Sequence, residues 1–248
     1  MTCAVLSGGA PGHEGTYLSL IARAGLPTQQ FIAADWPPNC STEQLGMGLA
    51  IARPSLEGPY VICYMVSFEL TRVLSGDVSA WASEVESLAR SIGVRPVAAL
   101  FQPIPEARAS GVAYTLDPVT GERLVVVQSV VGIHARLLAG GTPHDTFILD
   151  RGDLDIVEAR VLAKPRYLAV RGGVMEDIQN PEPERPSISD NEAREVAELA
   201  LRAEGVIGSP VEVEWAISGA GPIMLAARPI PAQLVGLQVG VAGGRTTG

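Results

Sequence analysis

The stretch 109–151 most constrains how this 248-residue chain can fold. Two of its segments, 112–115 and 123–131, are rich in the β-branched and aromatic residues that favour strands. Between them, Pro118 presets the backbone for a turn, and Gly121 can adopt the left-handed conformation that closes a hairpin loop. We therefore expect a β-hairpin at the centre of the chain.

Helical and strand patterns alternate on both sides of this hairpin, which predicts an α/β fold. The spacing of Ser189 and Glu192 is that of a capping box and predicts a helix start. The expected helices are 16–25, 79–93, 189–203 and a short one after Gly132. The expected strands are 3–6, 31–35, 48–54, 60–66, 97–103, 156–163, 166–171 and a closing hairpin within 211–230.

The amino-acid composition of the chain argues against several kinds of partner and site. The chain is 47% apolar, enough for a sizeable core, and its net charge of −9 argues against a nucleic-acid partner, because phosphate backbones attract basic surfaces. Cys3, Cys40 and Cys63 are widely spaced and show neither a disulfide framework nor a zinc pattern. Since no long apolar run is present, we expect a soluble, cytoplasmic protein with no membrane partner.

The closing hairpin carries a group of charged residues. Side chains alternate along a strand, so Glu212 and Glu214 share one face of the first strand, and Ala226 and Arg228 share a face of the second. If the strands pair, two carboxylates lie near one guanidinium. Carboxylates can hold Mg²⁺ and an arginine can bind phosphate, which is a constellation for phosphoryl transfer. The alternative is a solvent-exposed face with a cross-strand ion pair.

The segment SGVAYTLDPVTGE (110–122) resembles the SGV-x-[FY]-T-x-DP-x-TGE segment of the nucleotide-binding domain of phosphoenolpyruvate synthase, pyruvate phosphate dikinase and rifampin phosphotransferase. The similarity extends to 186–204 and to 211–230, where the family has DIEWAIDGGELYLLQARPI. The resemblance implies an ATP-grasp-like fold, in which two lobes with mixed or antiparallel sheets enclose a cleft. We expect lobes at 1–95 and 96–232 and a flexible tail at 233–248.

The resemblance also implies roles for individual residues. It makes Glu214 a ligand of Mg²⁺ and makes Arg53 and Arg228 catalytic arginines that contact phosphate. It places Gln102 in the adenine pocket of ATP, and the further candidates for cofactor binding are Glu212 and Thr115. From the residues alone, Arg53 is equally well a surface arginine at a strand end, and Gln102 a polar exit from an apolar strand.

Several positions depart from the family pattern. Glu14 stands where the family has a lysine, Ala135 where it has an acidic residue, and Ala226 where it has a glutamine. The glycine-rich phosphate loop is shortened to something like 67–70. These losses argue against ordinary ATP turnover, because each lost hydrogen bond to a charged group costs about 1.5–3 kcal/mol. His134 can replace a lost polar contact or simply cap the following helix.

Two functions fit these observations, and the sequence leaves open whether the chain is an enzyme. The first is a stand-alone ATP-grasp subunit, resembling phosphoenolpyruvate synthase, that binds Mg-ATP and transfers a phosphoryl group to a histidine domain or a small molecule on a partner. The alternative is a degenerate pseudo-enzyme that binds a nucleotide, another small ligand or a partner protein without turnover.

Overall fold

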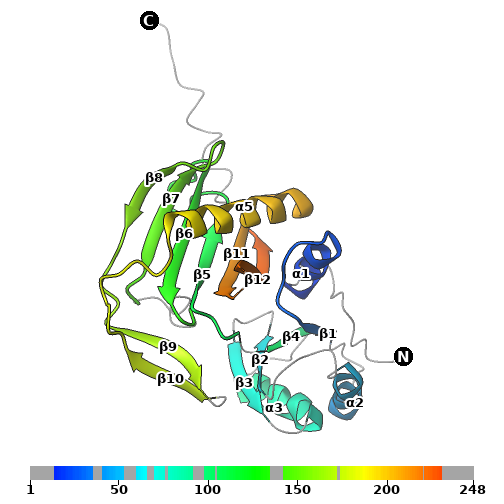
Figure 1. The fold of residues 1–248 in the computed structure, drawn as a ribbon. Helices are drawn as coiled ribbons and strands as arrows, with labels where there is room; N and C mark the ends of the chain where they lie inside the picture. The colour runs from blue at the N-terminus through cyan, green and yellow to red at the C-terminus, as the bar shows by residue number, and fades with distance from the viewer. Residues whose placement is uncertain are drawn as a thin grey trace, which may run out of the picture. The chain divides into compact units, whose positions relative to one another are not determined.

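The computed structural model describes residues 14–35, 41–52, 60–65, 70–75, 78–91, 98–103, 105–134, 142–171, 174–219 and 221–230. The chain divides into two compact units (Figure 1). The first comprises Met1–Pro105 with Val170–Val174, and the second comprises Glu106–Ala169 with Met175–Gly248. Both combine helices with antiparallel sheets, as the α/β prediction requires. Within the described ranges, no helix has the length and apolar character needed to span a bilayer.

The first unit contains a four-stranded antiparallel sheet in the order β1-β4-β2-β3. Trp81 of the third helix stacks on Phe101 of the fourth strand, with ring centroids 5.7 Å apart, and both rings are fully buried. The elements are α1 (Glu14–Arg23), β1 (Ile32–Asp35), α2 (Thr42–Ala52), β2 (Tyr60–Met65), β3 (Leu70–Ser75), α3 (Val78–Ser91) and β4 (Ala98–Pro103). Strand β4 pairs with β1 and β2, and so lies in this unit, although the predicted boundary at 95/96 assigned it to the second lobe.

The prediction of a strand at 48–54 is wrong for its described part, because 48–52 continue helix α2. The helix starts at a capping box. The backbone N–H of Gln44 donates to Ser41 Oγ at 3.2 Å, and the N–H of Ser41 donates to Gln44 Oε1 at 3.1 Å. Leu45 and Leu49 follow one turn apart and are fully buried. The apolar run therefore follows the helical period.

The second unit contains a six-stranded antiparallel sheet in the order β12-β11-β5-β6-β7-β8. Helix α5 (Asp190–Ile207) lies across one face of this sheet (Figure 1). The strands are β5 (Ala109–Tyr114), β6 (Leu124–Val131), β7 (Asp145–Asp150), β8 (Ile156–Arg160), β11 (Val211–Ser218) and β12 (Gly221–Pro229). A separate two-stranded sheet joins β9 (Arg166–Arg171) to β10 (Val174–Gln179).

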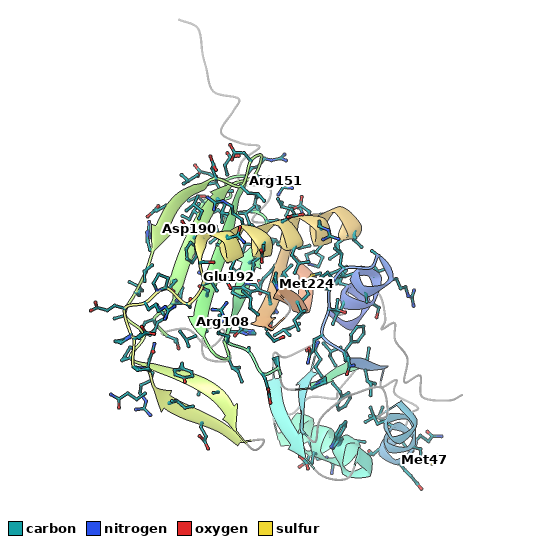
Figure 2. All side chains as sticks on the ribbon, viewed as in Figure 1. Met47, Arg108, Arg151, Asp190, Glu192 and Met224 are labelled. Atoms are coloured by element: carbon teal, nitrogen blue, oxygen red, sulfur yellow. The ribbon has the colours of Figure 1, made fainter. Side chains whose placement is uncertain are left out.

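Helix α5 covers the core of this unit. The face of β11 that carries Val213 and Trp215 is buried, as the alternation predicts. The predicted capping box between Ser189 and Glu192 is present, and the helix ends at Gly208 in the left-handed conformation. Two cross-element ion pairs, Arg108–Glu192 and Arg151–Glu204, hold the helix at both ends. Figure 2 labels Arg108, Glu192 and Arg151.

A buried ion pair fixes the segment that leads from β8 to α5. Lys164, the only lysine of the chain, donates from Nζ to Asp145 Oδ1 at 2.5 Å, and both side chains are almost fully buried. Asp145 also accepts hydrogen bonds from the backbone N–H of Leu162 and from both the N–H and the hydroxyl of Ser187. Because each charged group has an oppositely charged partner and further hydrogen bonds, the free-energy cost of burying the pair is offset.

Two glycines shape the central hairpin and its exit. Gly121 has φ of 71°, and its N–H donates to the carbonyl of Asp117, as the turn prediction requires. Gly132 has φ of 72°, and a Cβ at this position would lie 2.1 Å from the carbonyl oxygen of Leu168. Gly132 and Leu168 form a parallel β-bridge. Only glycine therefore allows the chain after β6 to contact the strand β9.

We expect Gly132→Ala to lower the free energy of unfolding by roughly 2–4 kcal/mol, because the left-handed backbone and the contact with Leu168 both exclude a side chain. Urea denaturation measures this loss. Gly205→Ala is the matched control, since no atom lies within 4 Å of a Cβ there and alanine favours the helix. Equal stability of the two variants would contradict the analysis of Gly132.

Candidate functional site on the open face of the second sheet

The predicted charged group lies on the sheet face opposite α5. Strands β11 and β12 pair so that Glu212 faces Arg228 and Glu214 faces Ala226, which confirms the expectation that this hairpin brings two carboxylates near one guanidinium. On the other side of β11, Glu212 faces Tyr114 of β5. Directly opposed residues of antiparallel strands share one face, so these side chains form a single group. We call Tyr114, Glu212, Glu214 and Arg228, together with His134 described below, the acidic face.

Glu212 and Arg228 form a cross-strand ion pair. Arg228 Nη2 donates to Glu212 Oε1 at 2.5 Å, and the side chains are 31% and 17% exposed for Arg228 and Glu212 respectively. Partial burial strengthens this contact relative to a surface pair. Both groups remain partly accessible, so a ligand anion can compete with Glu212 for the guanidinium.

Glu214 lies deeper and contacts a histidine. Its residue is 6% exposed, and Glu214 Oε2 lies 3.1 Å from Nε2 of His134, which is 3% exposed. With Nε2 protonated, the imidazole donates to the carboxylate. His134 Nδ1 is also buried and has no hydrogen-bond partner among the described residues. Burying such an atom costs free energy unless something pairs with it, so this corner of the acidic face can accept a ligand or an ordered water.

The contact of His134 with Glu214 was not predicted. The sequence analysis offered His134 as a replacement polar contact or as a helix cap. Its reach to Glu214 depends on the turn at Gly132 and on the pairing of β5 with both β6 and β11, which joins residues 80 positions apart. The available sequence signal was the departure from the family's GLGE, which reads Gly132-Ile133-His134-Ala135 here.

The pKa of the Tyr114 phenol reflects the charges on the acidic face. The pKa of Tyr114 is raised to about 12, chiefly by burial, since the phenolate is poorly solvated there. The carboxylates of Glu212 and Glu214 contribute to this rise, while Arg228 opposes it. The net effect of the three charged groups, two carboxylates and one guanidinium, is an excess of negative charge beside Tyr114.

The acidic face fits a divalent cation with a phosphate ligand. Its negative excess favours a cation, and Mg²⁺ needs only one or two protein carboxylates when phosphate oxygens and waters complete its shell. Glu214 has a second oxygen, Oε1, in addition to the one that contacts His134. In the part of the chain that the structure describes, no group of three or more metal-ligating side chains is present, so the protein alone offers no complete metal cage.

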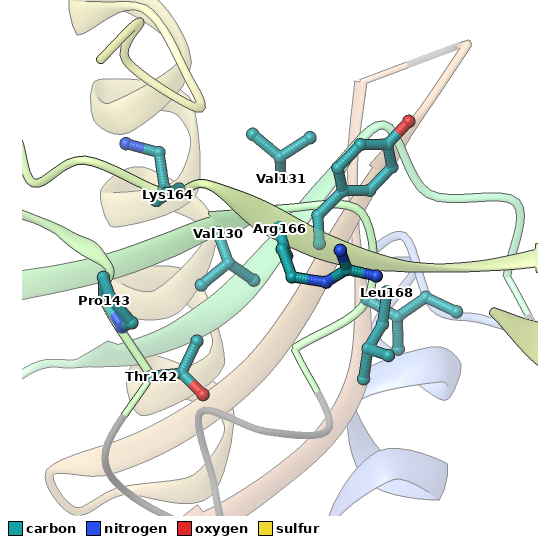
Figure 3. Close-up of a pocket in the computed structure, with 9 residues that line it drawn as sticks. Val130, Val131, Thr142, Pro143, Lys164, Arg166 and Leu168 are labelled. Carbon is teal, nitrogen blue, oxygen red and sulfur yellow. The ribbon is translucent and has the colours of Figure 1, made fainter. Parts of the chain in front are cut away.

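Two hollows elsewhere in the second unit are poor nucleotide sites. One measures about 30 Å³, the space of a single water molecule, and its lining includes Lys164 and Arg166 (Figure 3). The other measures about 470 Å³ and lies beside the start of α5. Its two arginines, Arg108 and Arg185, are paired with Glu192 and Glu182. It therefore carries no positive excess that would attract phosphates.

The structure describes only some of the remaining predicted residues. Thr115 is buried on the α5 side of the sheet, where its hydroxyl accepts a hydrogen bond from the N–H of Val211 at 2.9 Å. Gln102 is buried in β4 of the first unit. Arg53 lies outside the described residues, as does Ala135. Glu14 begins α1. The roles of these residues in binding ATP stay predictions.

A family model for the pyruvate phosphate dikinase AMP/ATP-binding domain matches residues 93–234, which include all of the acidic face. The chain belongs to this family. The match confirms the resemblance from which an ATP-grasp-like fold was expected. It also supports nucleotide binding by the matched domain.

The curated relatives of this chain named here are much longer than the chain itself. The prodigiosin synthesizing transferase PigC of Serratia marcescens is 29% identical over 95% of this chain and 28% of its own length. The phosphoenolpyruvate synthase of Aeropyrum pernix is 28% identical over 59% of this chain and 22% of its own length. Among solved structures, the D-alanine-D-alanine ligase of Coxiella burnetii has a TM-score of 0.47 at 10% identity, covering 89% of this chain and 48% of that one. The chain thus spans about a quarter of the curated relatives named here.

We expect the phenol of Tyr114 to stay protonated at pH 11, where an ordinary tyrosine is largely ionised. Because the folded state holds this proton more tightly than the unfolded state, the contribution of Tyr114 to stability falls as the pH rises from 10 towards 12. Ultraviolet titration of the protein and of Tyr114→Phe isolates its signal. Glu212→Gln should lower the pKa of Tyr114, and an unchanged pKa would contradict the proposed negative excess.

We expect His134→Ala to tighten Mn²⁺ binding at Glu214 roughly tenfold, because the imidazole then no longer occupies Glu214 Oε2. Electron paramagnetic resonance of free Mn²⁺ measures this affinity without a nucleotide. His144→Ala is the control, since Nδ1 of His144 contacts only the backbone of Thr142 among its described hydrogen bonds. Weaker Mn²⁺ binding by His134→Ala would show that the histidine supports the cation instead.

Proposed function

We propose that the acidic face binds ATP together with Mg²⁺, and that the bound ATP donates a phosphoryl group to an acceptor carried by a partner. The observation that carries this proposal is the gathering of Glu212, Glu214 and Arg228 on one partly accessible face. Family membership supports the nucleotide, and the charge balance of the face supports the cation. When bound, Mg²⁺ neutralises phosphate charge and so lowers the cost of phosphoryl transfer.

Each side chain has a distinct role in this proposal. Glu214 holds the cation through its carboxylate. Arg228 exchanges its contact with Glu212 for a bidentate contact with a phosphate group, which fits the planar guanidinium. Glu212, released from Arg228, remains beside the site as a second carboxylate for the cation or its waters. These steps need only local side-chain movement, because the strand pairing already sets the positions.

The acceptor is part of the proposal. The relatives named above include a synthase of phosphoenolpyruvate and a prodigiosin synthesizing transferase, and this chain matches about a quarter of each. We propose a histidine of a separate phosphohistidine domain as the acceptor, with a small molecule on the partner as the alternative. In a dikinase-type reaction the β,γ-diphosphate group would pass from ATP to the histidine nitrogen, with AMP as the leaving group. Attack of water on the γ-phosphorus would then release inorganic phosphate and leave one phosphoryl group on the histidine.

The contact of His134 with Glu214 favours a second candidate function. A carboxylate that already accepts a hydrogen bond is a weaker cation ligand, and Ala226, opposite Glu214, contributes no polar atom from its side chain. Both features are expected of a pseudo-enzyme that binds a nucleotide without turnover. Nucleotide chromatography separates the two functions: AMP formed in the presence of a phosphohistidine domain supports the enzyme, and bound ATP that persists unchanged supports the pseudo-enzyme.

We expect Arg228→Gln to weaken the binding of Mg-ATP by at least about tenfold, because the variant loses a charged hydrogen-bond partner of phosphate. Isothermal titration calorimetry with ATP, in the presence and absence of Mg²⁺, measures the effect. Arg185→Gln removes an arginine of the same unit that also pairs with a glutamate, and it should leave the affinity unchanged. Equal affinities of the two variants, or no ATP binding by the unaltered chain, would refute the proposal.

A further inference from the structure

Strand β8 is the free edge of the six-stranded sheet. It pairs with β7 on one side and is the last strand in the described sheet order. Apolar side chains along it and just after it are exposed: Val157 by 65%, Val161 by 41% and Leu162 by 49%. An edge strand with exposed apolar side chains can pair with a further strand, and its unpaired backbone groups supply the hydrogen bonds.

The sequence of this edge is complementary to itself. From Ile156 to Leu162 it reads two apolar residues, an acid, alanine, a base and two apolar residues. Two such strands that run antiparallel around Ala159 place Glu158 opposite Arg160 of the second copy, and Arg160 opposite Glu158 of that copy. The same register places apolar residues opposite apolar residues at both ends. Opposite charges and β-branched pairs that face each other directly stabilise antiparallel strands.

The orientation of the charged side chains agrees with this pairing. Glu158 faces Ile148 and Arg160 faces Thr146 on β7, so both point to the same face of the sheet. Within one chain they pair with each other along this face of β8, and both remain largely exposed. An exposed pair of this kind contributes little to stability, so exchanging it for contacts with a second copy costs little. The ladder irregularity lies at Val157, outside the charged centre.

We propose that β8 is the interface at which two copies of this chain associate, through antiparallel pairing centred on Ala159. The two sheets then continue as one across a two-fold axis, which is the self-complementary arrangement of a symmetric dimer. The occupant of the edge is a second copy, since the charges of the strand are opposite in sign to those of the same strand read in reverse. This surface is separate from the acidic face and does not depend on nucleotide binding.

Sedimentation velocity of the full chain over a concentration series tests the pairing. We expect a monomer–dimer equilibrium. Glu158→Arg and Arg160→Glu should each raise the dimer dissociation constant at least about tenfold, because each puts like charges opposite each other at both contacts. Mixing the two single variants should restore association as a mixed dimer, although each chain by itself keeps two like charges.

The mixture is the decisive measurement, because only a contact between copies can restore opposite charges in it. Circular dichroism confirms that the variants, which change exposed residues, keep their fold. A chain that stays monomeric up to its solubility limit would overturn the proposal. So would dimers that both single variants leave unchanged, or a mixture that associates no better than its components.

Discussion

The pairing of β11 with β12 is the constraint on which the site depends. This register places the apolar residues of β11 in the core and its two glutamates on the other face, because alternate residues of a strand point to opposite faces. Trp215 and its apolar neighbours are buried under α5, while Glu212 and Glu214 point to the other side beside Arg228. A shift by one residue would turn both carboxylates toward α5 and the tryptophan away from it. The energy of the core therefore fixes the geometry of the acidic face.

Glu214 is the proposed cation ligand of the acidic face. Its carboxylate is buried, and its hydrogen bond to His134 is a contact that a cation must share or displace. The family match supports nucleotide binding by this domain, while Ala226 and His134 make the site differ from the family pattern. The two functions proposed above differ in how strongly this contact competes with a cation for Glu214.

Local patterns predicted most of the second unit. The hairpin turn at Gly121, the capping box at Ser189 and the facing of Glu212 and Arg228 all follow from nearby residues and are confirmed. The misassigned strand at 48–52 shows the limit, because a short apolar run fits a strand or a buried helix equally well. His134 shows a second limit. Predicting its contact with Glu214 requires knowing how β6, β5 and β11 pair, and local sequence patterns do not reveal pairing between distant strands.

The most direct test of the account is a crystal structure of the chain with Mn²⁺ and a non-hydrolysable ATP analogue, in which the anomalous signal locates the cation. We expect the manganese peak beside the Glu214 carboxylate, with a phosphate group in contact with Arg228. A peak elsewhere, or a nucleotide bound on the α5 side of the sheet, would contradict this expectation.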